Sequence, residues 1–213
     1  AIFHTAGVIK WGSDPETGNF VLEGQKAVVT NIYDRRTVPG SLCQFSYALD
    51  THSDKSIWAA QKAFEDYVIT VAGFNKGSKD RRTWQDGTGA DRPNSYYVFS
   101  SQVFVKRVGV TKHREANIDY ELHPWIAAVT KGPKTEYFAN PDRPKLLEPY
   151  GGKLRNIKDS DSPQLKKGDV VWISFSVSFL LGGDTWTTNF TPFEIIRVGA
   201  VSADLIGDAA DRP

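Results

Sequence analysis

The residues best suited to chemistry lie near the end of the chain, where cations and aromatic rings share one hairpin. Lys166 and Lys167 precede a Gly-Asp turn, Trp172 follows in the next segment, and Trp186 lies in the return segment. A lysine can bind a phosphate group, and a flat aromatic ring can stack on a nucleobase. The combination is typical of a surface that binds single-stranded nucleic acid.

Arg81, Arg82 and Trp84 form a second candidate site in the polar segment 75–95. Two guanidinium groups beside one indole can hold a phosphate group and a base together. The alternative is structural, with the Trp84 ring anchoring a long loop to the body of the protein. Long segments of this kind are often functional, and we favour the clamp.

Further cations are candidates for phosphate contacts because charge is unevenly distributed along the chain. Residues 76–167 contain 18 Lys and Arg against 11 Asp and Glu, although the whole chain has a formal net charge of +1. A basic segment inside a nearly neutral protein can form an anion-binding face. The candidates in this segment are Lys106 and Arg107. The alternative is that these charges are only solvated.

The sequence contains no motif for catalysis, metal binding or a cofactor. The 4 histidines lack metal-ligand spacing, and the chain has no Gly-x-Ser-x-Gly elbow, phosphate loop or dinucleotide fingerprint. The chain has 1 cysteine, Cys43, so an intramolecular disulfide is excluded. Apolar and polar residues alternate on both sides of Cys43, which predicts a strand with a buried thiol. We therefore expect a non-catalytic protein with no metal and no cofactor.

The elements that position these side chains are predicted to be mostly strands, because apolar and polar residues alternate. Besides the closing hairpin, strands or strand fragments are expected at residues 8–11, 19–22, 26–33, 42–49, 96–105 and 125–129. One helix is expected at about 54–72, where Ile57, Trp58, Phe64 and Val68 recur at helical spacing. The sequence therefore predicts a mainly β protein.

The closing hairpin also has a predictable orientation. Trp172, Ser174, Ser176 and Ser178 fall on one face of the first strand, whereas Val171, Ile173, Phe175, Val177 and Phe179 fall on the other. The second set is the expected core face, so Trp172 belongs to the outer face. A loop covering Trp172 is the alternative to a base stacked on it. In the return strand, Trp186 shares a face with Thr188 and Phe190, and this face can be either a platform or core.

Residues 26–53 and 165–198 resemble the corresponding blocks of OB-fold single-stranded-DNA-binding proteins. The first block has a strand, the Asp34-Arg35-Arg36 loop, a Pro39-Gly40 turn and an alternating strand. The second has the Leu165-Lys166-Lys167-Gly168-Asp169 turn, a tryptophan-bearing hairpin and an Ile-Ile-x-Val end. The segment between them is much longer than is usual in this family, and in this respect resembles the phage-type members.

The resemblance implies an OB-like five-stranded barrel with added strands, one flanking helix and long ordered loops. We expect a single domain over residues 1–213, with barrel blocks at about 20–53, 96–106 and 165–199 and a long insertion at about 107–164. In this family nucleic acid lies across aromatic residues and lysines, and Arg35 and Arg36 occupy the first loop that meets it.

Non-catalytic, sequence-tolerant binding of single-stranded nucleic acid, with DNA favoured, is the function that these patterns indicate. Two alternatives remain open, a carbohydrate-binding lectin of the β-sandwich type and a jelly-roll coat or structural protein. The start of the chain lacks a basic segment followed by a long apolar one, which predicts a cytoplasmic or nuclear protein. No membrane contact is expected, and a homo-oligomer is possible.

Overall fold

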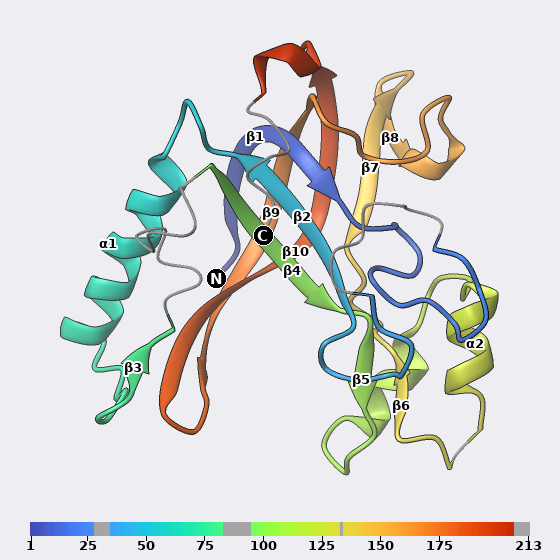
Figure 1. Ribbon diagram of the computed structural model, residues 1–213, viewed down its shortest axis with the longest axis horizontal. Coiled ribbons are helices and arrows are strands. Elements are labelled where there is room, and N and C mark those ends of the chain that lie inside the picture. Colours follow the sequence, from blue (N-terminus) through green and yellow to red (C-terminus); the bar gives the residue numbers. More distant parts are fainter. Residues whose placement is uncertain (28–34, 83–94, 133, 207–213) are drawn as a thin grey trace.

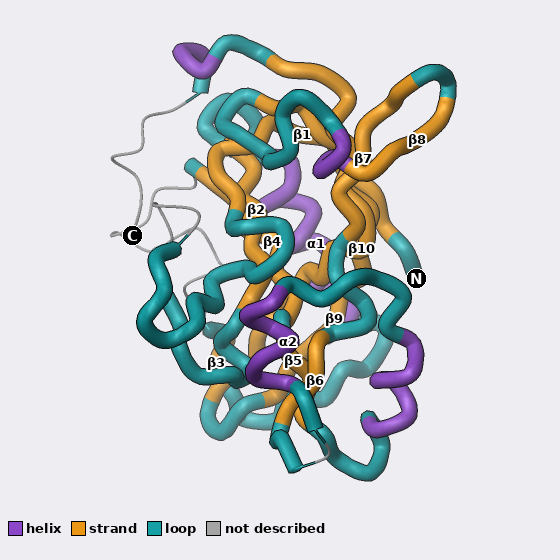
Figure 2. Tube along the Cα trace, turned by 90° about the vertical axis from the view of Figure 1, so that its right-hand side faces the viewer, coloured by secondary structure: helices purple, strands orange, loops and turns teal. Residues whose placement is uncertain are grey.

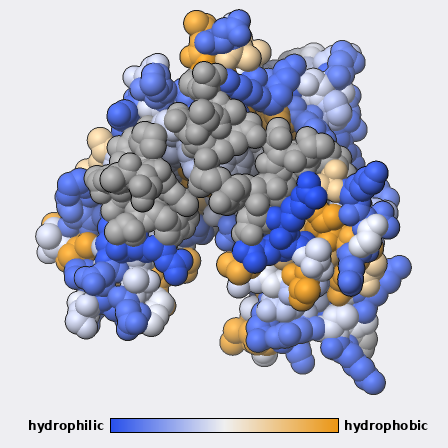
Figure 3. Space-filling model, viewed as in Figure 1, coloured by the Kyte–Doolittle hydropathy of each residue, from blue (hydrophilic) through white to orange (hydrophobic). Residues whose placement is uncertain are grey.

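A computed structural model describes residues 1–27, 35–82, 95–132 and 134–206. The protein is mainly β, as the sequence predicts, with one large sheet and two α-helices at opposite sides of it in Figure 1. In the view of Figure 3 the surface is mostly hydrophilic, with small separate groups of hydrophobic side chains. Among the described residues, no helix is both long enough and apolar enough to span a membrane.

Five strands form the central part of the sheet. They are β1 (Phe3–Gly12), β2 (Gln44–Asp50), β4 (Tyr96–Gln102), β9 (Asp169–Leu181) and β10 (Thr185–Ala200). The order is β4-β2-β1-β9-β10, and each neighbouring pair is antiparallel. The sheet curls so that β4 approaches β10, where Ser100 Oγ lies 3.4 Å from Asn189 Oδ1. This arrangement is consistent with an OB-like barrel.

Other strands extend the barrel. β7 (Lys145–Tyr150) pairs parallel to β10, and β8 (Lys153–Asn156) pairs antiparallel to β7. The two form a hairpin that projects from the body in Figures 1 and 2. β3 (Asp80–Arg81) pairs parallel to the tip end of β10.

A separate two-stranded sheet lies between the barrel and α2. It consists of β5 (Phe104–Lys106) and β6 (Tyr137–Ala139). Short 3₁₀ helices occur in the connections, at Lys112–Asn117, Ile157–Asp159 and Ala203–Leu205. Much of the predicted insertion 107–164 therefore has regular structure, and its β7 and β8 belong to the large sheet.

The barrel interior is filled by the face of the closing hairpin that the sequence predicts. Val171, Ile173 and Phe175 are at most 4% exposed, as is Phe190 on β10. Cys43 is 1% exposed, which confirms the predicted buried thiol. Successive residues of each strand face opposite sides, and on β10 this alternation shifts at a bulge between Pro192 and Glu194.

The turn that opens the hairpin depends on Gly168. Its φ is +99°, and a Cβ built there would lie 2.6 Å from the carbonyl oxygen of Val201. The backbone N–H of Lys166 donates to Asp169 Oδ2 at 3.0 Å, which closes the same turn. The Gly-Asp pair in the sequence is therefore required by the geometry of the chain rather than by ligand binding.

The predicted helix is confirmed as α1 (Ser56–Thr70), which lies beside one end of the barrel in Figure 1. Its most buried residues are Gln61 and Glu65, not its apolar ones. Both are hydrogen-bonded, with Gln61 Nε2 donating to Glu65 Oε1 at 3.0 Å. The helix therefore meets the barrel through polar groups as well as through half-buried Ile57, Trp58 and Phe64.

The strand fragment predicted at 125–129 is wrong, because this segment is helix α2 (Pro124–Thr130). Pro124 occupies the first turn, where its fixed φ suits a helix and its missing N–H costs nothing. His123 Nδ1 accepts a hydrogen bond from the backbone N–H of Trp125 at 3.2 Å. The helix-start signals of His123 and Pro124 therefore outweigh the strand preference of the β-branched residues that follow.

Other predicted boundaries also differ from the structure. The first barrel strand is the ten-residue β1, which lies outside the predicted block 20–53 and is much longer than the predicted 8–11. Residues 19–22 form no strand, since Phe20 makes only an isolated bridge with Arg36. Most of the predicted strand 26–33 lies outside the described residues.

Candidate nucleic-acid interface

Trp172 is a large aromatic side chain on the outer face of the sheet. Its side chain is 44% exposed, so the structure agrees with the orientation predicted from alternation. Its register partners are Ala6 on β1 and Ile196 on β10, and Ile196 pairs in turn with Leu147 on β7. These four residues form a row across the sheet, and Trp172 is separated from Leu147 by two strand spacings, about 10 Å.

His4 partly covers Trp172 from one side. The two rings are stacked, with centroids 5.7 Å apart and an interplanar angle of 26°. His4 Nδ1 also lies 3.1 Å from Ser174 Oγ, its register partner on β9. The indole is therefore held in place by a second ring while much of its surface remains accessible to a flat ligand.

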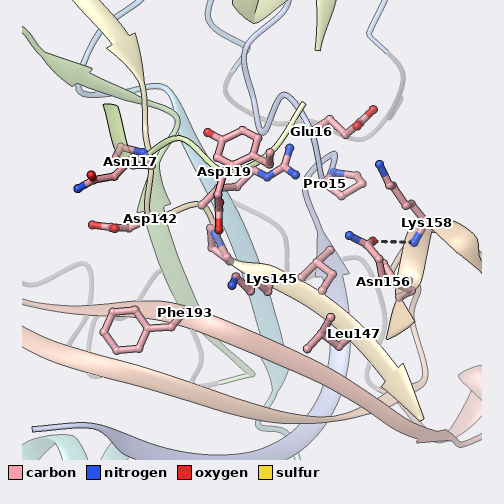
Figure 4. A pocket seen from close by; sticks show the side chains of 16 residues that line it. Pro15, Glu16, Asn117, Asp119, Asp142, Lys145, Leu147, Asn156, Lys158 and Phe193 are labelled. Atoms are coloured by element: carbon pink, nitrogen blue, oxygen red, sulfur yellow. Dashed lines mark hydrogen bonds between the residues drawn. The ribbon is translucent and has the colours of Figure 1, made fainter. Parts of the chain in front are cut away.

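Leu147, at the end of this row, is part of the wall of a groove of about 680 Å³. Four separate segments and one bulge residue contribute side chains to it (Figure 4). The charged and aromatic residues of its lining include Glu16, Asp119, Tyr120, Arg143, Lys145, Lys158 and Phe193. The groove exists because the long middle segment folds back against β7 and β10.

Arg143 is held firmly at this groove. Its guanidinium carbon lies 4.0 Å from the centroid of the Tyr120 ring. The Tyr120 hydroxyl donates to the carbonyl oxygen of Asn140 at 2.5 Å, and burial raises the pKa of Tyr120 to about 12. The ring therefore stays neutral and fixed, which orients the guanidinium that packs on it.

The cations of the groove lack acidic partners. Within the described residues, neither Arg143 nor Lys145 nor Lys158 forms an ion pair, and Arg143 Nη1 has no hydrogen-bond partner. By contrast, Arg114 nearby binds Asp142 at 2.5 Å. Lys145 lies opposite Glu194 in the strand register but does not bind it. The exposed side chains of Lys145 and Lys158 are therefore available to an anionic ligand, and the half-buried Arg143 lies beside them without an ion-pair partner.

Phe193 gives the groove an aromatic wall. It is the extra residue of a bulge in β10, between the partners of Phe175 and Ser174 on β9. The bulge turns its ring outward, where it is 37% exposed. Figure 4 shows Phe193 on β10 next to Lys145 and Leu147 of β7.

Trp186, which the sequence offers as a stacking residue, does not join this surface. Trp186 is 4% exposed and packs against Phe74 and Phe179, with Arg81 over its ring at 5.9 Å. The structure places it in the interior, where its faces are not available to a base, because β10 turns residues 186, 188 and 190 inward. Trp84 lies outside the described residues.

Three of the predicted cations are engaged within the protein. Arg81 binds Glu65, with Nε 2.7 Å from Oε2 and Nη2 2.9 Å from Oε1. Lys106 binds Glu136 at 2.8 Å, and Arg107 binds Glu115 at 2.5 Å with only 8% of its side chain exposed. Each of the three cations therefore has an acidic partner within the protein, although the Lys106–Glu136 pair is largely exposed.

The remaining predicted cations are at the surface but apart from the groove. Arg35, Arg82 and Lys166 are exposed, whereas Arg36 and Lys167 are half-buried. Arg36 also fixes its loop, since its backbone accepts from the N–H of Val21 at 2.8 Å. None of these five residues lines the groove, and Lys166 lines a separate pocket together with Glu148 and Arg197.

Sequence reasoning missed Phe193, Tyr120, Arg143 and Lys145. The structure marks Phe193 by a change in the buried positions of β10, which pass from even to odd numbers between Pro192 and Ile195. Such a phase change is typical of a bulge. No local pattern marks Arg143, whose role depends on Tyr120 from another segment.

A half-buried ion network next to the row fastens β7 and β8 to β10. Glu148 on β7 accepts hydrogen bonds from Arg197 on β10 and from Arg155 on β8, the latter at 2.6 Å. These two guanidinium groups hold the pKa of Glu148 below its ordinary value of 4.5. The charged carboxylate is therefore the form that stabilises this end of the sheet.

We expect the protein to lose stability in acid through this group. A carboxyl whose pKa is lower when folded contributes stability above its unfolded pKa and loses it as the pH falls through the folded one. The contribution of Glu148 should be complete above about pH 5 and decline below pH 4.5. Thermal unfolding of wild type and Glu148→Gln between pH 7 and 3 measures this. A wild-type melting temperature that falls no more than that of the variant would contradict it.

Comparison with known proteins finds a similarity in structure but no match in sequence. No protein-family model matches the chain, and no curated protein matches it. Among solved structures it is similar to gp2.5, a single-stranded DNA binding protein encoded by bacteriophage T7. The alignment covers 97% of this chain and 97% of that chain, with a TM-score of 0.41 and 10% sequence identity. A similarity at this level does not identify the function of the chain.

Proposed function

We propose that this protein binds single-stranded nucleic acid, with DNA favoured, without catalysis and with little sequence preference. The observation that carries the proposal is the exposed Trp172 ring on the outer face of the sheet. The row from Trp172 to Leu147 leads directly to a groove with three cations that have no acidic partner in the described part of the chain. A single strand lying along this row would meet a stacking ring first and positive charge next.

The chemistry of these groups fits a strand better than a duplex. A base can stack on an indole only when it is unpaired or splayed out, and every base has a flat face, so the contact tolerates any sequence. Lysine and arginine bind the phosphates and make the affinity dependent on salt. The same ring could stack on a sugar, but a neutral sugar would not use the cations of the groove, and its binding would be insensitive to salt.

Replacing Trp172 with alanine should weaken binding of a labelled oligonucleotide. The expected loss is about 1–3 kcal/mol, the usual contribution of one base stacked on an aromatic ring. Fluorescence anisotropy at two salt concentrations measures the dissociation constant. Trp172→Phe should retain most of the affinity because it keeps a ring at this position.

Tyr67→Ala is a matched control, because Tyr67 is an aromatic residue that is 55% exposed on α1, away from the row. It should bind as the wild type does. Equal affinities for wild type and Trp172→Ala, or binding that does not weaken with salt, would refute the proposed function. Salt-insensitive binding to a glycan array would instead support a lectin.

A further inference from the structure

We propose that the groove beside Phe193 is a subsite for one nucleotide of the bound strand. In it, Phe193 stacks on the base, while Arg143, Lys145 and Lys158 bind the phosphates on either side. This inference rests on the proposed function and assigns a second contact region, distinct from Trp172. It predicts that binding depends on residues that no pattern in the sequence singles out.

The size of the groove suits a ligand of this class. Its volume of about 680 Å³ lies within the range of small-molecule pockets, about 300–1,000 Å³. Its floor and walls come from strands β7 and β10 and from loops that pack on them. A nucleotide can therefore enter without rearrangement of the strands.

The cations are arranged for phosphate. Arg143 is fixed by the Tyr120 ring at 4.0 Å, so little side-chain entropy is lost when it binds an anion. A guanidinium group can also contact two phosphate oxygens at once. Lys145 and Lys158 add two exposed ammonium groups, and Figure 4 shows Lys145 towards Phe193 and Lys158 beside Asn156.

The groove also offers hydrogen-bond acceptors, which a simple phosphate site would not need. Glu16 and Asp119 line it together with Asp142, whose carboxylate is bound by Arg114. Asn156 instead offers a donor, because its side-chain oxygen accepts from the backbone N–H of Lys158 at 3.0 Å (dashed in Figure 4) and its amide NH2 is thereby oriented. Bases carry amino groups that bind such carboxylate acceptors, so the groove matches the base and the phosphate of one ligand.

The cations are tested by the salt dependence of binding. For single strands, each lost phosphate contact lowers the slope of log K against log salt by about 0.7. Lys145→Gln combined with Lys158→Gln should therefore lower the slope by about 1.4. Lys153→Gln is the matched control, because Lys153 and Asn156 are three residues apart on β8 and face opposite sides. It should leave the slope unchanged.

The aromatic wall is tested with Phe193→Ala, which should weaken binding by between about 5-fold and 150-fold. Phe193→Leu keeps the apolar volume but lacks a flat ring, so it should lose most of the same affinity. Circular dichroism melts verify that each variant is folded. The two tests use the complete chain and an oligonucleotide of mixed sequence.

The outcomes separate this inference from the proposed function. If the groove variants bind with wild-type slope and affinity while Trp172→Ala does not, the nucleotide subsite is refuted and the proposed function stands. If the wild-type protein binds no oligonucleotide at low salt, both are refuted. Loss of slope in the double lysine variant, together with loss of affinity in both Phe193 variants, establishes the subsite.

Discussion

Replacing Glu65 with alanine should lower the free energy of unfolding by about 3–5 kcal/mol, the usual cost of removing one partner from a buried ion pair. Glu65 lies on α1 and is 5% exposed. It binds the guanidinium group of Arg81 through both oxygens, at 2.7 and 2.9 Å. The Thr188 hydroxyl on β10 also donates to it. Without this carboxylate, a half-buried cation and a buried hydroxyl lose their acceptor.

The effect extends beyond one contact because Glu65 connects three elements. Gln61 donates to it at 3.0 Å, and the Tyr97 hydroxyl on β4 donates to Gln61 at 2.6 Å. Burial, and secondarily the charge of Glu65, raises the pKa of Tyr97 well above its usual value. The hydroxyl therefore stays a donor, and the network joins α1 to β3, β4 and β10.

Urea unfolding followed by circular dichroism measures the change. Asp66→Ala is the matched control, since Asp66 is the next residue on α1 and binds Lys62 at 2.9 Å with 61% of its side chain exposed. An exposed pair of this kind contributes about 0–1 kcal/mol. Glu65→Gln should fall between the two, because it keeps the shape but not the charge. A loss for Glu65→Ala no larger than the control's would show that the network does not hold the helix.

The elements that local patterns predict best are those whose partners are near in sequence. The closing hairpin is confirmed, as is the orientation of its first strand, because one Gly-Gly-Asp turn joins the two strands and period-2 alternation fixes the faces of β9. Helix α1 is correct in extent but not in its buried face. Helical spacing does not point to Glu65, which is buried because it binds Arg81 and Thr188, residues that follow later in the chain.

The candidate site was predictable only in part, because many of its residues have partners that are distant in the sequence. Alternation assigns Trp172 to the outer face without knowledge of its neighbours, and the structure agrees. Alternation does not show which cations form ion pairs, since the acidic partners of Arg81 and Arg107 lie on other segments. The groove could not be foreseen, because Arg143 and Phe193 meet only when β7 pairs with β10.

The second large effect is expected for Phe99→Ala, which should cost about 3–5 kcal/mol of stability, as is usual for removing a buried aromatic ring. Phe99 on β4 is fully buried. Its ring centroid lies 5.1 Å from that of Phe175 on β9 and 6.2 Å from that of Phe190 on β10. In the described part of the chain, no hydrogen-bonded ladder joins β4 to β10. The aromatic cluster therefore closes the barrel where the backbone does not.

Denaturant unfolding of Phe99→Ala and Phe99→Leu separates ring contacts from simple filling of space, and the leucine variant should lose less than half as much. At a temperature where both variants are folded, their affinity for an oligonucleotide should equal that of the wild type, since Trp172 faces outward on β9, on the side opposite the cluster. A loss of affinity with stability intact would mean that the cluster also sets the position of the outer row. In that case the aromatic contacts that close the barrel between β4 and β10, and not only the surface residues, would control binding.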